Sequence, residues 1–505
     1  MSRPHIRPAR RPPPPRIPAT NHLKHARRFA ALLSLVVCLS GASQSQTLDA
    51  HVSISSLAPA RAHVEGRRTG ATKVWSFRNA YAGLSNLGER LENLSLTDAD
   101  GARVNVRRLA SGEYEAERDA SGFSYDIKLA PPSAPADAAN VSWLAGDHGV
   151  LMPGDLLPLP LSNVKLRLTL PSGWNVSSAE TKTGDNLFEL SDAENAVFLV
   201  GRALRERRVR VSGSMTTTFV TTGDWAFTDE EAATAVGKLL EQHEKILGGP
   251  PAKQTHVILA PFPAPVGAQT WSAETRGRTV FLLSGRWPSK TAALAFLNVP
   301  LAHELLHLWI PNALALDGDY DWFYEGFTLY QSLRAGMRLG IFTFQDYLNA
   351  LGRAADGYRA TAQSAELSLP DASRRRWSDG GQFVYNKGML VAFLYDLTLR
   401  RQTSNKQSLD DVYRELFRRH SLSQPRREAN KAIIEILRAQ QGMSDFTERH
   451  ISSASALDLE RAVAPFGLRV EASGARTRLA VNPSLTAAQR ELLRKLGYNE
   501  RASKS

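Results

Sequence analysis

Apolar and polar residues alternate along the first part of the chain with the two-residue period of a β-strand. The segment Val164 to Leu170 places apolar residues at every second position and ends at the turn Pro171-Ser172-Gly173. Short β-branched segments such as Thr216 to Val220 follow, separated by Gly, Asn and Asp. Period-two alternation with frequent turns is typical of antiparallel sheets. The pattern therefore predicts an antiparallel β domain over residues 47–222.

The period changes to that of a helix after this domain. Thr228 and Glu231 have the spacing of a capping box, in which each side chain accepts a hydrogen bond from the backbone N–H group of the other residue. We expect the helix to run to about Leu247 and to end at Gly248-Gly249, because glycine readily takes the left-handed conformation that closes a helix.

The rest of the chain is mainly helical in pattern. Residues 223–440 are expected to form a mainly helical domain that includes strands at 256–260 and 278–283. Residues 441–505 form a small C-terminal extension, with a strand candidate at 467–471 and a helical end at 485–496. The sequence thus predicts a multidomain α+β protein.

The N-terminus has the order of an export signal. A basic stretch precedes the apolar run Phe29 to Leu39, and the small residues Ser40-Gly41-Ala42 follow. This is the arrangement of a signal peptide, and eleven apolar-rich residues are too few to span a bilayer comfortably. We expect a signal peptide over residues 1–42 with cleavage near Ala42 and no stable membrane span afterwards. An uncleaved anchor is the alternative.

Charge and cysteine content narrow the function. The net charge is +12, but residues 1–28 hold eight basic residues and no acid, so the rest of the chain carries only +4. A nucleic-acid partner therefore loses its main support. Cys38 is the only cysteine and lies inside the apolar run. Any metal site in the exported protein must then use His, Asp or Glu.

Residues 303–307 read His-Glu-Leu-Leu-His. On a helix, positions four apart lie on one face, so His303 and His307 can bind the same metal ion. Glu304 then lies beside the metal, where it can take a proton from water bound there. The flanking residues are mostly apolar, and a buried, uncompensated glutamate costs several kcal/mol, of order 1–5. The motif therefore predicts a catalytic zinc site.

A catalytic zinc with an open position needs a third protein ligand. The metzincin pattern, with a further glycine and histidine, fails because Ile310 and Ala313 stand at those places. Glu325, eighteen positions after His307, is the candidate carboxylate, since that distance lets one helix end and a second return. The nearby Asp321 is interpreted, with its neighbours Asp317 and Asp319, as a solvated loop charge or helix cap.

The motif and the segment around Glu325 resemble the gluzincin metallopeptidases, and most closely the glycyl aminopeptidase family. The segment Tyr385-Asn386-Lys387-Gly388 is similar to that family's Tyr-x-Lys-Gly. The resemblance spans roughly residues 150–470. It implies a thermolysin-like zinc peptidase domain over residues 223–440, while a C-terminal PDZ domain found in many members has no room here.

The resemblance also implies roles for individual residues. His303, His307 and Glu325 would bind one Zn²⁺, and Glu304 would be the general base that assists attack of zinc-bound water on a peptide bond. Tyr385 would donate a hydrogen bond to the tetrahedral oxyanion. Glu274 would bind the free α-amine of the substrate, although Trp271 and Ser272 replace two glycines of the family's segment.

We therefore predict an exported zinc metallopeptidase, an aminopeptidase acting on peptides in a bacterial periplasm or outside the cell. The bacterial assignment follows from the family and the signal. Two alternatives stay open: an endopeptidase, and a catalytically silent peptide-binding protein that retains the fold. The run Arg374 to Trp377 is interpreted as a solvated loop, and the aromatics Trp309, Trp322, Phe323 and Phe327 as core packing around the zinc helices.

Overall fold

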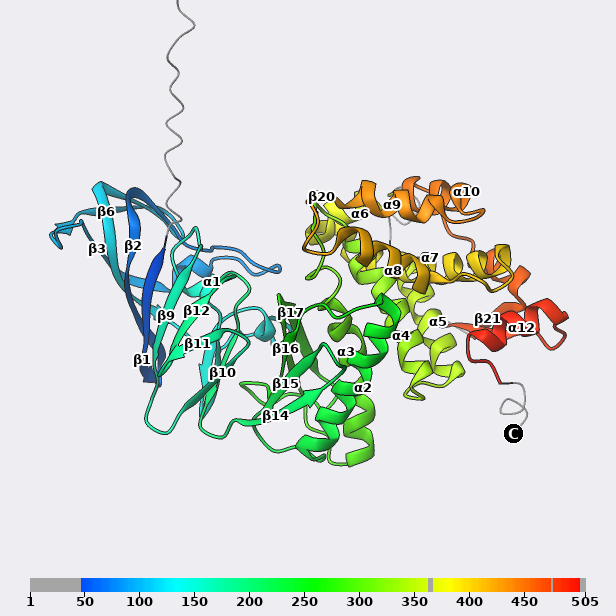
Figure 1. Cartoon of the computed structure of the whole chain (residues 1–505), viewed down its shortest axis with the longest axis horizontal. Coiled ribbons are helices and arrows are strands. Elements are labelled where there is room, and N and C mark those ends of the chain that lie inside the picture. The colour runs from blue at the N-terminus through cyan, green and yellow to red at the C-terminus, as the bar shows by residue number, and fades with distance from the viewer. Residues whose placement is uncertain (1–46, 362–366, 474–475, 500–505) are drawn as a thin grey trace, which may run out of the picture. The chain divides into compact units, whose positions relative to one another are not determined.

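The computed structural model describes residues 47–361, 367–473 and 476–499, and these residues belong to one compact unit. The predicted signal peptide lies outside the described residues. Strands dominate the first part and helices the second, so the predicted α+β class is confirmed (Figure 1).

The largest sheet of the described part is built from the alternating segments. In β9, Val164, Leu166 and Leu168 are buried while the residues between them are exposed, as the period-two pattern predicts. The strand order is β11-β12-β9-β1-β2-β6-β3-β4, with β5 on β6, and all pairs are antiparallel except β1 with β9. The strands are β1 (Leu48–Leu57), β2 (Ala60–Ser76), β3 (Leu91–Thr97), β4 (Arg103–Val104), β5 (Val106–Ala110), β6 (Glu113–Lys128), β9 (Val164–Thr169), β11 (Thr181–Gly184) and β12 (Leu187–Leu190).

A second sheet has the order β10-β13-β8-β7. Its strands are β7 (Trp143–Ala145), β8 (His148–Leu151), β10 (Asn175–Ser178) and β13 (Phe198–Gly201), and short helices η1 (Leu87–Arg90), η2 (Pro135–Ala139) and α1 (Pro153–Leu156) connect this region. Apolar side chains of β7, β8 and β13 pack with those of the central sheet described next.

The central sheet carries one edge of the site. Its order is β14-β15-β16-β18-β17, with the strands β14 (Arg205–Arg210), β15 (Thr216–Thr221), β16 (Gln254–Pro261), β17 (Trp271–Arg276) and β18 (Thr279–Ser284). Strands β16 and β18 are apolar on both faces, because side chains of β7, β8 and β13 pack on one face while those of α2 and α3 pack on the other.

The central sheet bears on two sequence predictions. The segment from Trp271 to Glu274, which comes before the strand candidate at 278–283, lies in a strand of its own, the edge strand β17, paired antiparallel with β18. Its lack of an alternating apolar pattern hid this strand. Strands β14 and β15, which the sequence groups with the β domain, are hydrogen-bonded into the same sheet as β16. The predicted domain boundaries stay predictions.

Helix α2 (Asp229–Leu247) begins and ends as predicted. Thr228 and Glu231 form the capping box, and Gly248 closes the helix with φ of 84°. The other helical elements are α3 (Lys290–His307), the π-helical η3 (Trp322–Phe327), α4 (Thr328–Arg338), α5 (Phe344–Ala360), α6 (Leu369–Arg374), the π-helical η4 (Arg376–Gly380), α7 (Gly381–Gln402), α8 (Leu409–His420) and α9 (Ala429–Ala439). The short pair β19 (Leu316–Asp317) and β20 (Arg427–Glu428) links this region.

The C-terminal extension contains the predicted strand and the predicted helix, and a second strand that the pattern did not predict pairs with the first to form a hairpin. It comprises α10 (Ser444–Thr447), η5 (Glu448–Ser452), α11 (Leu459–Val463), η6 (Ala464–Phe466), β21 (Leu468–Ser473), β22 (Arg476–Val481) and α12 (Ala487–Lys495). The interpretation of Trp309, Trp322, Phe323 and Phe327 as core residues is confirmed, since all four are fully buried. In the described part of the chain, no helix is both long and apolar enough to cross a bilayer.

Candidate metal centre and active-site cleft

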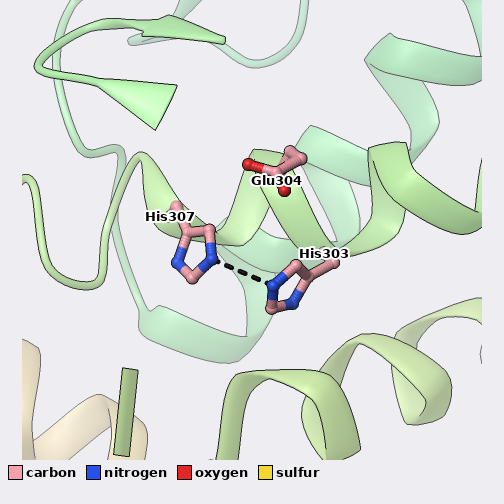
Figure 2. A group of neighbouring side chains, drawn as sticks. All are labelled: His303, Glu304 and His307. Carbon is pink, nitrogen blue, oxygen red and sulfur yellow. Dashed lines mark hydrogen bonds between the residues drawn. The ribbon is translucent and has the colours of Figure 1, made fainter. Parts of the chain in front are cut away.

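The last turns of α3 bring His303, Glu304 and His307 together. The two imidazoles lie one helical turn apart, and their Nε2 atoms are 3.1 Å from each other (Figure 2). All three side chains are buried. Donor atoms of these three residues lie within 4.8 Å of one another, a spacing that suits a single metal ion.

Glu325 reaches the same point from η3. Its Oε2 lies 3.3 Å from Nε2 of His303 and 3.5 Å from Nε2 of His307. The approach depends on Gly326, which packs against Gly388 of α7 so closely that an added Cβ would lie 2.6 Å from the Gly388 Cα. Two imidazole nitrogens and one carboxylate oxygen therefore converge from two elements.

These donors fit zinc. Tetrahedral ligands at the usual Zn–N and Zn–O distances lie about 3.3 Å from one another, and the observed separations of 3.1, 3.3 and 3.5 Å bracket this value. Nδ1 of His307 lies 2.8 Å from the Ile310 carbonyl oxygen and is placed to donate to it. Nε2 of His307 then keeps a lone pair for a metal.

The electrostatics of the group also favour a cation. Burial opposes a charge on His307, yet the hydrogen bond and negative charge of Glu325 raise the pKa of His307 to about 9. Burial by itself would raise the pKa of Glu325, but hydrogen bonds from His303 and His307 hold it well below its ordinary value. The site therefore stabilises positive charge next to an ionised carboxylate.

Glu304 is held by the edge strand. The Thr275 hydroxyl lies 3.0 Å from both Oε2 and the backbone oxygen of Glu304. The Asn312 side-chain amide donates to the Thr275 and His307 carbonyl oxygens at 3.2 and 2.9 Å. Sequence reasoning missed Thr275 and Asn312, because no motif links a strand residue to a loop beyond the helix.

Tyr385, on α7, lies close to Glu325, and Arg376 contacts both side chains. The Arg376 guanidinium donates to the Tyr385 oxygen at 2.8 Å and lies 3.0 Å from Oε1 of Glu325. It also pairs with Asp321 at 2.5 Å. The solvated interpretations of Arg376 and Asp321 are therefore wrong, because each charge compensates the other in a largely buried pair.

Glu274, on β17, contacts a residue of the N-terminal part of the chain, Tyr81. The hydroxyl of Tyr81, in the segment after β2, donates to Glu274 at 2.7 Å. Arg276 donates to the Tyr81 oxygen at 3.2 Å, and its guanidinium lies 4.1 Å from the Tyr81 ring centre. Burial raises the pKa of Glu274, while the Tyr81 hydrogen bond lowers it. Tyr81 lies within the predicted β domain, where the sequence shows no catalytic motif.

Apart from Arg276 and Asp321, these side chains line one cleft of about 1080 Å³. His303, Glu304, His307 and Glu325 form one part of its lining, and Glu274 and Tyr81 form another. Trp271 and Trp377 also line the cleft and are 41% and 67% exposed. The arrangement can hold a metal, a general base, an oxyanion donor and a carboxylate for a cationic group within one cleft.

Comparison with known proteins agrees with this chemistry. Residues 296–391 match the family model of the M61 glycyl aminopeptidases. This segment includes His303, His307, Glu325 and Tyr385, so the resemblance expected from the sequence is confirmed. No curated protein matches the chain.

Solved structures share the fold at low sequence identity. An aminopeptidase N family protein from Idiomarina loihiensis superposes with a TM-score of 0.72 at 17% identity, covering 84% of this chain and 79% of that one. An M1 zinc metallopeptidase from Deinococcus radiodurans gives a TM-score of 0.53 at 14% identity, covering 82% and 96%. A variant of that enzyme bound to a Tyr-Ser-Ala substrate gives 0.53 at 14%, covering 82% and 95%.

Proposed function

We propose that this gluzincin-type zinc metallopeptidase is an aminopeptidase that binds one zinc ion per chain through His303, His307 and Glu325. The observation that carries the proposal is the Glu274 carboxylate, which shares the cleft with the metal donors. A peptide whose first peptide bond reaches the metal would place its α-ammonium group near such a carboxylate, which would bind it by a charge-assisted hydrogen bond.

The residues of the cleft divide the hydrolysis among them. Zinc, when bound, polarises the scissile carbonyl and makes water more acidic. Glu304, oriented by Thr275, takes the proton of the attacking water and passes it to the leaving amine. The Tyr385 hydroxyl donates a hydrogen bond to the oxygen on which negative charge develops. Burial raises the pKa of Tyr385, so it keeps its proton at neutral pH.

The surroundings of Glu274 support exopeptidase rather than endopeptidase action. Tyr81 donates to Glu274, and the hydroxyl of Ser272 donates to the Ala136 carbonyl oxygen at 2.7 Å. These contacts tie β17 to the segments that carry Tyr81 and Ala136, and we propose that they limit the room for residues before the scissile one. An aminopeptidase needs that limit, whereas an endopeptidase needs an open path.

Peptide hydrolysis and zinc content test the proposal together. We expect the purified protein to contain one zinc per chain, and Glu325→Ala to lose it. We expect a short peptide with a free amine to be cleaved at its first bond, and its N-acetylated form to be resistant. Cleavage of both peptides would favour an endopeptidase. A folded protein that holds zinc but cleaves neither would favour the silent binding protein.

We also propose that the enzyme acts after export to the bacterial periplasm or the medium. The support is the apolar run Phe29 to Leu39 between basic and small residues. Fractionation of expressing cells, followed by N-terminal sequencing, should find the protein outside the cytoplasm and starting near residue 43. Retention in the membrane fraction with an intact N-terminus would favour the uncleaved anchor.

A further inference from the structure

We propose that Arg376 is a positioning residue that fixes two groups at once: the carboxylate of Glu325 and the phenol of Tyr385. The inference rests on the proposed function, in which Glu325 binds the metal and Tyr385 donates to the oxyanion. No sequence motif singles out Arg376, and its position follows from the side-chain geometry alone.

One nitrogen of the Arg376 guanidinium is fixed by protein partners, and the other contacts the groups of the active site. One guanidinium nitrogen, Nη1, donates to Asp321 at 2.5 Å and to the Tyr324 oxygen at 2.9 Å. Tyr324 itself donates to Asp321 at 2.5 Å, which fixes the direction of both acceptors. The Arg376 side chain is 15% exposed, so its charge depends on these protein partners rather than on water.

The second nitrogen, Nη2, faces the metal donors. It lies 3.0 Å from Oε1 of Glu325, while Oε2 of the same carboxylate faces His303 and His307 at 3.3 and 3.5 Å. A charge-assisted hydrogen bond to one oxygen fixes the rotation of the carboxylate. Arg376 thus leaves a single oxygen of Glu325 for the metal, and partners of this kind typically change metal affinity by about 10–100-fold when removed.

The same nitrogen settles the direction of the Tyr385 proton. A guanidinium has no acceptor atom, so in its 2.8 Å contact with Arg376 the Tyr385 oxygen must accept. The Tyr385 O–H is then left to donate toward Glu325, with which it hydrogen-bonds here, and in the proposed reaction it would donate to the developing oxyanion. The positive charge at the phenol oxygen also makes Tyr385 a better hydrogen-bond donor.

Arg376 also connects the two elements that carry these groups. It begins η4, which leads directly into α7 with Tyr385, and Asp321 immediately precedes η3 with Glu325. The buried ion pair therefore ties the start of one element to the start of the other. Loss of the guanidinium should release both Glu325 and Tyr385, which distinguishes this role from a contact with either residue alone.

The test compares Arg376→Gln and Arg376→Lys with the matched control Arg374→Gln in the full exported chain. Arg374 is two positions away, exposed, and paired only with Asp371 among the contacts found for its side chain in the described residues. The readouts are the zinc dissociation constant from chelator competition, and kcat and KM measured separately at saturating zinc. Thermal melting checks that each variant is folded.

We expect Arg376→Gln to weaken zinc binding by about 10–100-fold. We expect kcat at saturating zinc to fall by about 100-fold while KM changes little, as for loss of an oxyanion donor. Combining Arg376→Gln with Tyr385→Phe should lower kcat little further, because the arginine acts through the phenol. Arg376→Lys keeps the positive charge but loses the two-nitrogen geometry of the guanidinium. Its zinc affinity and kcat should therefore lie between those of wild type and Arg376→Gln.

Two results would overturn the inference. One is wild-type zinc affinity and kcat in a folded Arg376→Gln variant, and the other is an equal loss in Arg374→Gln. If Arg376→Gln does not fold, the test rests on Arg376→Lys. Wild-type zinc affinity and kcat in that variant would show that the two nitrogens of the guanidinium are not needed. Failure of the proposed function looks different, because the wild-type chain itself would then bind no zinc or cleave no peptide.

Discussion

At the scale of single residues, Glu304 lies close to the metal donors but differs from them in the partner that its carboxylate contacts. Its carboxylate accepts from Thr275, whereas His303, His307 and Glu325 face one another. We predict that Glu304→Gln keeps bound zinc and loses about 10²–10⁴-fold in kcat, because the amide fills the same space but cannot take a proton. Zinc analysis and steady-state kinetics on one preparation measure both quantities.

The control for this prediction is Glu325→Gln, which should lose zinc as well as activity. Equal zinc loss in Glu304→Gln and Glu325→Gln would contradict the division of roles, since it would make Glu304 a ligand.

Tyr81 gives a second prediction at this scale, one that concerns pH. Burial raises the pKa of Glu274 and the Tyr81 hydrogen bond lowers it. Tyr81→Phe should therefore raise this pKa further, so Glu274 becomes protonated at a higher pH and binds an ammonium group less well. We expect KM for a free-amine peptide to rise as pH falls, and to begin rising at a higher pH in Tyr81→Phe than in wild type.

The matched control is Tyr114→Phe, which removes a phenol from β6 outside the cleft. Its KM should follow the wild-type pH profile. Identical profiles for wild type and Tyr81→Phe would mean that Tyr81 does not tune Glu274.

At the scale of elements, the contact between η3 and α7 sets where Glu325 lies. An added Cβ at Gly388 would meet the Trp322 carbonyl oxygen at 2.7 Å and the Gly326 Cα at 2.9 Å. Both are backbone atoms, so the elements must separate. We predict that Gly388→Ala lowers the free energy of unfolding by about 1–3 kcal/mol, as overpacking does, and weakens zinc binding. Urea unfolding and chelator competition measure the two effects.

The direction of the stability change distinguishes overpacking from the ordinary effect of alanine in a helix. Gly388 lies inside a helix, where alanine in open space would stabilise by about 0.5–1 kcal/mol. Gly213→Ala is the control, because an added Cβ there meets no atom within 4 Å and its φ is not positive. A stabilised Gly388→Ala with unchanged zinc affinity would show that the elements tolerate separation.

Elements whose signals are local in sequence were predicted well. The capping box of Thr228 and Glu231 fixes the start of α2 through contacts three residues apart. The histidines of α3 meet because the helical repeat itself places positions four apart on one face. Such features need no knowledge of the rest of the fold, so the sequence alone suffices to predict them.

Features that depend on distant partners were missed or misinterpreted. Arg376 lies in a segment whose composition is typical of a solvated loop. Its ion pair with Asp321, 55 positions earlier, allows its side chain to be largely buried. Tyr81 meets Glu274 across 193 positions. Strand β17 is an edge strand, defined by its pairing with β18 rather than by its own pattern. A single sequence holds no signal for such contacts.

At the scale of the whole molecule, buried histidines couple the packing of separate elements to pH. His256 of β16 lies 3.2 Å from the Ser177 hydroxyl of β10, and His243 of α2 lies 3.0 Å from the Ala302 carbonyl oxygen of α3. Burial lowers the pKa of each to about 4. Each therefore stays neutral in the folded chain at a pH where the unfolded chain, with an ordinary value near 6.5, binds a proton.

The sign of the effect follows from this difference in bound protons. Between about pH 6.5 and 4 the unfolded state binds more protons, so the free energy of unfolding falls as pH falls, by up to about 3 kcal/mol for each histidine.

We predict that His256→Gln loses this share of the pH dependence, so its stability falls less steeply than that of wild type over this range. Urea unfolding at fixed zinc concentration and several pH values measures the two slopes. Parallel slopes for wild type and His256→Gln would show that His256 is protonated in the folded chain, and the β10–β16 contact would then have to accommodate its charge.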